Sequence, residues 1–342
     1  MCKRILKCLF FLLMWGGAAA QDIHLSQFYE TPLLRNPALA GIFTGDVRVQ
    51  SVYRNQWQSV TYPYRTNTLS AEYKFPVGYA NDFLTIGVQT FYDVAGIARL
   101  STAQVMPALN FHKALNAEKN TFLSAGFMAG YVQRNFNDKN LTFDNQYNGG
   151  RYDPSAPSGE NWGTLRRGFV DFAAGLSFSS SLANAGNYYL GVSLFHLTKP
   201  TESFMNKEFV LMRKFQANAG VKVSFNDALQ FRGEVNYLKQ GPFSEIMLGG
   251  LATYHITDMY EEGTNIKSVS VSGGLFLRLN DAAVPVVKLN YNNFEIGMSY
   301  DANISKLSTA SRGRGGYELS LSYKGFLSGY SSTYGLMTCP VF

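Results

Sequence analysis

Apolar and polar residues alternate with a period of two along most of the chain between residues 46 and 323. In residues 215–225, every odd position is apolar and every even position is polar or glycine. Successive side chains of a β-strand point to opposite faces, so this pattern predicts a strand with one apolar and one polar face. About fourteen such segments follow one another without a helical pattern between them. The expected strands cover residues 46–57, 66–75, 82–92, 99–112, 120–134, 168–180, 187–196, 213–224, 228–238, 245–255, 267–279, 284–290, 293–300 and 316–323.

A series of two-faced strands predicts an all-β fold, a transmembrane antiparallel β-barrel of an outer membrane with about fourteen strands. The apolar faces meet lipid and the polar faces line the lumen, where charged side chains avoid a cost of roughly 2–4 kcal/mol each. The long polar connections, 135–167, 197–212 and 301–315, alternate with short ones. Outer-membrane barrels have short periplasmic turns, so we expect the long connections outside the cell. The connection 257–267 is long for a periplasmic turn.

The first twenty residues have the pattern of a cleaved signal peptide. A basic start precedes a seven-residue apolar core at 9–15 and three alanines at 18–20. That core is too short for a membrane-spanning helix, which needs roughly 20 apolar residues. Three basic residues leave with this segment, so the net charge falls from +6 to +3 and nucleic acid is not an expected partner. Cys339 then remains alone, either as a buried small side chain or as a thiol able to crosslink to a partner.

The rest of the chain is predicted to form one domain with two appendages. Its composition, 15% aromatic and 16% charged, fits a barrel with aromatic girdles better than a soluble domain, which carries about 25% charged residues. The expected division is a signal peptide over 1–20, an N-terminal plug or periplasmic lead-in over 21–45, the barrel over 46–323 and a C-terminal periplasmic segment over 324–342.

The chemistry-bearing residues do not predict an enzyme. The four histidines lack metal-ligand spacing to another His, Cys or carboxylate, so no metal is expected. No nucleophile elbow, phosphate loop or dinucleotide fingerprint is present, so no cofactor is expected. The open alternative is a serine–histidine hydrolase on the barrel wall, which would need a histidine on the outer face beside a serine.

Three blocks of the sequence resemble the PorP/SprF family. The first contains Gln27-Phe28-Tyr29, Pro32-Leu33, Asn36-Pro37-Ala38, Ala40-Gly41 and Arg54-Asn55-Gln56-Trp57. The second contains residues 299–307 and 315–321, and the third is Cys339-Pro340-Val341-Phe342. The family often has arginine where Val341 stands, a small departure in a resemblance that covers the chain from about Gln21 to Phe342.

This resemblance implies an outer-membrane protein of the type IX secretion system of Bacteroidota. Such proteins act in the export or surface attachment of proteins with a C-terminal secretion domain, and some work with gliding adhesins. We therefore expect capture or anchoring of secreted cargo at the cell surface. The expected partners are that cargo, periplasmic ring or motor components, and outer-membrane lipid. The alternative is a passive porin or conduit.

Eight residues are candidates for partner binding, each with a structural alternative. Asn36 and Pro37 belong either to a plug packed on the barrel or to a docking surface for a periplasmic partner. Trp57 is either a girdle aromatic or a binding residue, and Arg54 would point into the lumen. The loop 301–315 is either a solvated loop or a fold-back that contacts cargo. Its candidates are Asp301, Asn303, Arg312 and Arg314.

Overall fold

The computed structural model describes most of the chain after the predicted signal peptide. The described residues are 22–58, 62–78, 81–116, 119–161, 164–182, 186–204, 209–259, 267–305, 308–311 and 313–326. The expected signal peptide, Arg312, Cys339 and nearly all of the expected C-terminal segment lie outside these ranges.

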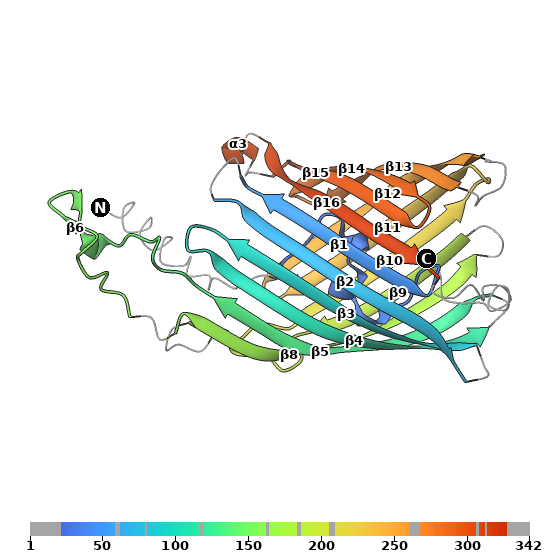
Figure 1. Cartoon of the computed structure of the whole chain (residues 1–342), viewed down its shortest axis with the longest axis horizontal. Coiled ribbons are helices and arrows are strands. Elements are labelled where there is room, and N and C mark those ends of the chain that lie inside the picture. The colour runs from blue at the N-terminus through green and yellow to red at the C-terminus, as the bar shows by residue number, and fades with distance from the viewer. Residues whose placement is uncertain are drawn as a thin grey trace, which may run out of the picture.

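Within the described residues, fourteen antiparallel strands form a closed barrel (Figure 1). The strands, in chain order, are β1 (Val47–Gln56), β2 (Tyr64–Val77), β3 (Asp82–Ala95), β4 (Leu100–Asn116), β5 (Thr121–Asn135), β8 (Arg166–Leu182), β9 (Gly186–Phe195), β10 (Lys214–Ser224), β11 (Leu229–Gln240), β12 (Phe243–Met259), β13 (Lys267–Arg278), β14 (Ala282–Tyr291), β15 (Phe294–Asn303) and β16 (Arg314–Gly325). Each strand pairs with its chain neighbours, and β1 closes the barrel by pairing with β16. The predicted fold and strand number are confirmed.

The remaining elements are short. A hairpin of β6 (Tyr147–Asn148) and β7 (Arg151–Tyr152) lies in the connection between β5 and β8, preceded by the 3₁₀ turn η3 (Asp144–Gln146). One helical turn, α3 (Ser308–Ser311), lies between β15 and β16. The segment before β1 contains η1 (Phe28–Glu30), α2 (Pro32–Arg35) and η2 (Pro37–Leu39). No helix among the described residues is long and apolar enough to cross a membrane.

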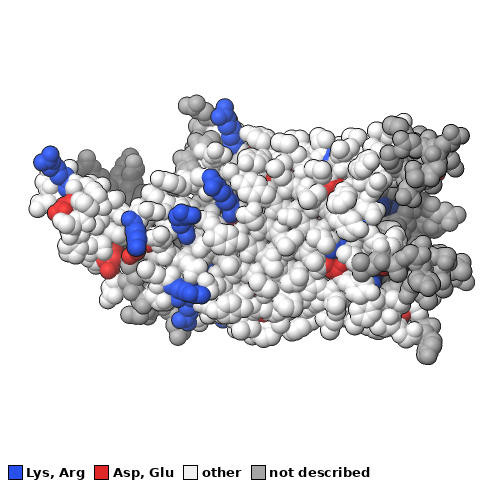
Figure 2. Space-filling view, viewed as in Figure 1, with Lys and Arg blue, Asp and Glu red and all other residues white. Residues whose placement is uncertain are grey.

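The alternation of apolar and polar residues gives a barrel with apolar side chains on the outer wall and polar side chains in the lumen. On β16, Leu319 and Leu321 are 45% and 50% exposed on the outer wall, whereas Glu318 is 1% exposed and faces the lumen. The same division holds on the other strands, and the middle of the outer wall shows a wide band without charged side chains (Figure 2). Such an uncharged band is what a lipid bilayer requires of a barrel exterior.

The long connections all lie at one end of the barrel, which we call the loop end. They run over 136–165, 196–213 and 304–313, and the opposite end, the turn end, carries the connections after even-numbered barrel strands. The connection expected over 257–267 is shorter than predicted because β12 and β13 continue into it, leaving 260–266 outside the described residues.

The expected loop 301–315 is also shorter in the structure. Strand β15 continues through Asn303, and β16 begins at Arg314. Asp301 pairs with Gly316 across the two strands and is 2% exposed, so its carboxylate faces the lumen. A charged residue is tolerated there because cationic side chains of the lumen wall neutralise it. The alternation of apolar and polar residues alone did not reveal these partners.

Residues 22–45, here called the plug, lie inside the barrel and form its core with the lumen wall. Phe28 and Tyr29 pack on Phe276, with ring centroids 5.5 and 4.9 Å away. Leu33 and Ala40 pack in a second buried cluster with residues of β4, β5, β8 and β9. Small apolar patches on the otherwise polar lumen surface thus receive the apolar side chains of the plug.

Candidate functional site

The plug passes through the lumen lengthwise. At the loop end, the Asp22 backbone N–H donates to Gln240 Oε1 at 3.0 Å, and Gln240 is the last residue of β11. At the turn end, the Asp46 N–H donates to the carbonyl of Gly325, the last residue of β16, at 2.9 Å. The segment therefore begins at the mouth that carries the long loops and reaches β1 only after crossing the barrel.

Because the plug pairs with no strand, its backbone needs hydrogen-bond partners from the lumen wall. Glu318 accepts hydrogen bonds from the backbone N–H groups of Ser26 and Gln27 at 2.6 and 2.7 Å. Glu72 accepts from the N–H of Gly41 at 2.8 Å. The plug carbonyls accept from side chains of six strands: Arg54, Lys74, Asn110, Ser177, Ser193 and Gln216.

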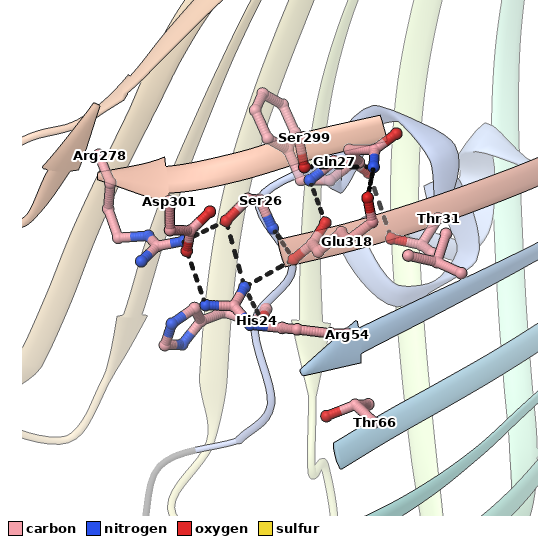
Figure 3. A network of polar contacts seen from close by, with 12 residues as sticks. His24, Ser26, Gln27, Thr31, Arg54, Thr66, Arg278, Ser299, Asp301 and Glu318 are labelled. Atoms are coloured by element: carbon pink, nitrogen blue, oxygen red, sulfur yellow. Dashed lines mark hydrogen bonds and ion pairs between the residues drawn. The ribbon is translucent and has the colours of Figure 1, made fainter. Parts of the chain in front are cut away.

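A buried ion network holds the first residues of the plug (Figure 3). Arg54 of β1 pairs with Glu318 Oε1 at 2.7 Å and with Asp301 Oδ2 at 3.0 Å. Arg278 of β13 pairs with the same Asp301 oxygen at 3.1 Å. The Ser26 hydroxyl lies between the two guanidinium groups and accepts a hydrogen bond from each. Four strands, β1, β13, β15 and β16, and the plug are thus joined by charges that are almost fully buried.

A second charged cluster holds the middle of the plug. Arg35 donates to Glu234 Oε2 at 2.9 Å, and Arg232 pairs with the other oxygen of that carboxylate. Tyr189 donates its hydroxyl to the same glutamate. Glu30 of the plug also forms an ion pair with Lys288 of β14. Plug residues of both signs therefore meet their counter-charges on the wall.

Asn36 and Pro37 sit against the wall where it carries glycine. Asn36 Nδ2 donates to the carbonyls of Leu176 and Val192 at 3.1 and 3.2 Å. A Cβ on Gly175 would lie 1.9 Å from Asn36 Oδ1, and one on Gly126 would lie 2.4 Å from Pro37. These two wall positions need glycine because the plug backbone approaches the strands so closely.

The structure places the eight candidate residues in two groups. Asn36 and Pro37 form one buried contact between plug and wall, and Arg54 and Asp301 form another, as described above. Trp57, Asn303 and Arg314 lie at the loop end. Trp57 is half-buried and packs edge-on against Tyr64 at 4.9 Å. Asn303 donates to Ser311 Oγ, Arg314 is exposed, and Arg312 lies outside the described residues.

Sequence reasoning missed the partners on the wall. Glu318 falls on the polar face of the strand expected over 316–323, but its role in binding plug N–H groups was not foreseen. Arg278 and Glu72 were not singled out at all. The available signal was the number of charged residues of both signs on the polar faces of the strands. That number is larger than a water-filled lumen requires.

The four histidines show no arrangement of an outer-wall hydrolase among the described residues. His112 bonds Ser124 Oγ at 2.7 Å, but both side chains face the lumen and are covered by the plug. In the described part of the chain, no group of three or more His, Cys, Asp or Glu residues is placed to hold a metal ion.

The plug is fastened at the loop end by His196, which follows β9 and lies outside the membrane-spanning strands. Its Nδ1 lies 2.7 Å from Asp171 Oδ2 and its Nε2 lies 2.8 Å from Asp22 Oδ2. Lys214 also pairs with Asp22, at 2.7 Å. Burial opposes the imidazolium, but the charge of Asp22 and the hydrogen bonds with Asp171 and Asp22 outweigh it and raise the pKa of His196 to about 9.

This pKa predicts that alkaline pH loosens the start of the plug. The pKa of His196 lies above its ordinary value of about 6.5, so protonated His196 stabilises the folded state fully below pH 6.5. This stabilisation is progressively lost as the pH rises through 9. A spin label on Ile23→Cys, with Cys339 replaced by alanine, should become more mobile between pH 7 and 10. In His196→Gln the label should show the same mobility at both pH values. An unchanged spectrum in the parent would contradict the assignment.

The fold and the filled lumen define a plugged β-barrel of the outer-membrane type. The chain belongs to the PorP/SprF family of type IX secretion system membrane proteins, whose family model matches residues 17–323. This is a family of secretion-system components rather than of enzymes, and an outer-membrane location fits both the family and the barrel.

Comparison with curated proteins found no match. Among solved structures, the chain is similar to the CymD monoaromatic hydrocarbon channel, at 12% identity and a TM-score of 0.46, covering 92% of this chain and 96% of that one. It is also similar to a deltaS2S3 mutant of the TodX monoaromatic hydrocarbon channel, at 8% identity and 0.46, covering 85% and 93%. BamA from Haemophilus ducreyi matches at 9% identity and 0.39, covering 82% and 70%.

Proposed function

We propose that this chain captures or anchors secreted cargo with a C-terminal secretion domain at the cell surface and couples it to the secretion and gliding machinery. Family membership supports the secretion system as the setting. The filled lumen is the observation that carries the proposal, because a receptor needs no open pore. Two cavities beside the plug have volumes of only ≈ 20 and ≈ 30 Å³, room for one or two water molecules each.

The loop end is the surface that this proposal assigns to cargo. The connection over 136–165 reaches beyond the barrel wall and carries the β6–β7 hairpin at its tip (Figure 1). Tyr147 and Tyr152 lie opposite each other on this hairpin, 51% and 45% exposed, with ring centroids 5.5 Å apart. Exposed tyrosines on a projecting element are typical anchors of protein interfaces.

The predicted partner-binding residues divide accordingly. Trp57 and Arg312 are proposed to contribute to the cargo surface at the loop end, and Asn303 to position α3 there through its hydrogen bond to Ser311. Arg314, on the lipid-facing side of the same end, is proposed to contact outer-membrane lipid. Asn36, Pro37, Arg54 and Asp301 are proposed to act indirectly, by holding the plug in place. The periplasmic ring and motor components are assigned to the turn end, where the short turns and the start of β1 lie.

The test is an affinity pull-down of the tagged protein from native outer membranes in mild detergent, followed by mass spectrometry. We expect recovery of a large protein with a C-terminal secretion domain. Replacing Tyr147 and Tyr152 together by serine should lower that recovery at least about tenfold, since each interface anchor contributes roughly 2 kcal/mol. Phe225→Ser is the matched control, because Phe225 is 67% exposed directly after β10, at the opposite end of the barrel. Recovery of the bare barrel, in a preparation where other secretion complexes survive, would contradict the proposal.

The second candidate is a passive porin or conduit, which the barrel architecture itself favours. Reconstitution in a planar bilayer separates the two candidates. The receptor proposal expects the wild-type protein to be silent, whereas steady large conductance would favour the porin.

A further inference from the structure

Arginines surround the loop end where the strands leave the uncharged band. On the face shown in Figure 2, Lys and Arg side chains gather at that end of the molecule, and the middle of the wall is free of them. Six exposed arginines lie within one residue of the start of a barrel strand: Arg65, Arg99, Arg166, Arg167, Arg213 and Arg314. This position is the level at which a bilayer presents its headgroups, so each guanidinium can reach a lipid phosphate.

Arg314 lines a surface pocket on the outer wall at the seam between β1, β15 and β16. The pocket has a volume of ≈ 320 Å³ and is also lined by Asn55, Gln58, Tyr300, Gly315, Gly316 and Tyr317. Tyr300 is 40% exposed toward the lipid side, and Met298 and Leu319 continue the apolar wall next to it. The site therefore combines a cation, two phenol rings and an apolar surface. Among the described residues, Arg314 has no acidic partner.

The pocket also contains an unfilled hydrogen-bond acceptor. Asn55 is only 5% exposed, and its Oδ1 has no hydrogen-bond partner among the described residues. Its Nδ2 donates only a long bond of 3.5 Å to the Tyr53 hydroxyl. A buried amide oxygen without a partner costs about 1–3 kcal/mol, so a ligand that supplies an N–H or O–H group would be favoured here.

We propose that this pocket binds a phosphorylated glycolipid of the outer leaflet. Arg314 pairs with the phosphate, since a guanidinium donates two parallel hydrogen bonds to phosphate oxygens. An amide N–H or hydroxyl of the sugar donates to Asn55 Oδ1, and the sugar ring packs on Tyr300 and Tyr317. The acyl chains follow the apolar wall along Leu319. A glycolipid fits better than a free phosphate or sugar phosphate because neither of these uses that wall.

The test measures binding of monophosphorylated lipid A to the purified full chain in detergent by native mass spectrometry. Arg314→Ser should weaken binding about tenfold, and Arg314→Lys should weaken it less, because lysine keeps the charge but loses the paired hydrogen bonds. Arg151→Ser is the matched control, since Arg151 is exposed on the β6–β7 hairpin away from the wall. Heat-dependent gel mobility verifies that each variant is folded.

Two comparisons of ligand complete the experiment. Lipid A without its phosphate should bind about tenfold more weakly than the monophosphorylated form, and phosphatidylglycerol should also bind more weakly, because it lacks the sugar amide. Equal affinity of the wild type and Arg314→Ser, or equal affinity for the dephosphorylated lipid, would overturn the proposal. Equal affinity for phosphatidylglycerol would overturn recognition of the sugar.

Discussion

Arg54→Met is expected to be among the most destabilising single changes in the chain. Arg54 is 2% exposed and neutralises both Glu318 and Asp301. Removing one partner of a buried ion pair leaves an uncompensated charge and costs about 3–5 kcal/mol. The loss should also free the first plug residues, because Glu318 holds the N–H groups of Ser26 and Gln27. Urea-dependent folding into lipid vesicles measures the change in the free energy of unfolding.

Arg65→Met is the matched control for this prediction. Arg65 lies on β2, directly across from Asn55 of β1 and next to the residue that pairs with Arg54 across the two strands. Its side chain, however, is exposed on the outer wall. The same change of charge and size there should alter the free energy of unfolding by no more than about 0.5 kcal/mol. Equal effects of the two substitutions would mean that the buried network does not stabilise the fold.

The barrel was predictable from sequence because its rule is local. Each strand alternates at every second residue, so the face of Leu319 or Glu318 follows from its immediate neighbours. The strand number and lumen side of the charges were therefore correct. The ends of β15 and β16 were not, since Asp301 continues a strand only because Arg54 and Arg278 neutralise it in the lumen.

The path of the plug was not predictable in the same way. Residues 22–45 have no period, and their conformation depends on wall residues that are distant in sequence, as in the pair of Gln27 with Glu318, 291 residues apart. Asn36 and Pro37 are residue types that favour turns, and the structure has the 3₁₀ turn η2 there, capped by Asn36. No local signal specified that the segment enters from the loop end, because that depends on the closed barrel being present around it.

Deleting residues 22–43 is expected to convert a silent barrel into a conducting one. The plug fills the lumen with side chains that are fully buried, such as Leu33 and Ala38. Without it, the lumen wall retains polar groups that water can solvate, including the carboxylates of Glu72 and Glu318. The barrel keeps its strands, since each one is paired with its neighbours independently of the plug. A planar bilayer containing the deletion variant should show steady conductance that the wild type lacks.

The control retains the plug but weakens one of its contacts. Asn36→Ala removes two hydrogen bonds to the wall at Leu176 and Val192 and leaves the remaining segment in the lumen. This variant should show at most brief openings, because the ion networks at Arg54 and Glu234 still hold the plug on both sides. If the deletion variant inserts with normal heat-dependent gel mobility and stays silent, the plug is not what closes the lumen. If the wild type already conducts steadily, the protein is a pore and the receptor proposal fails.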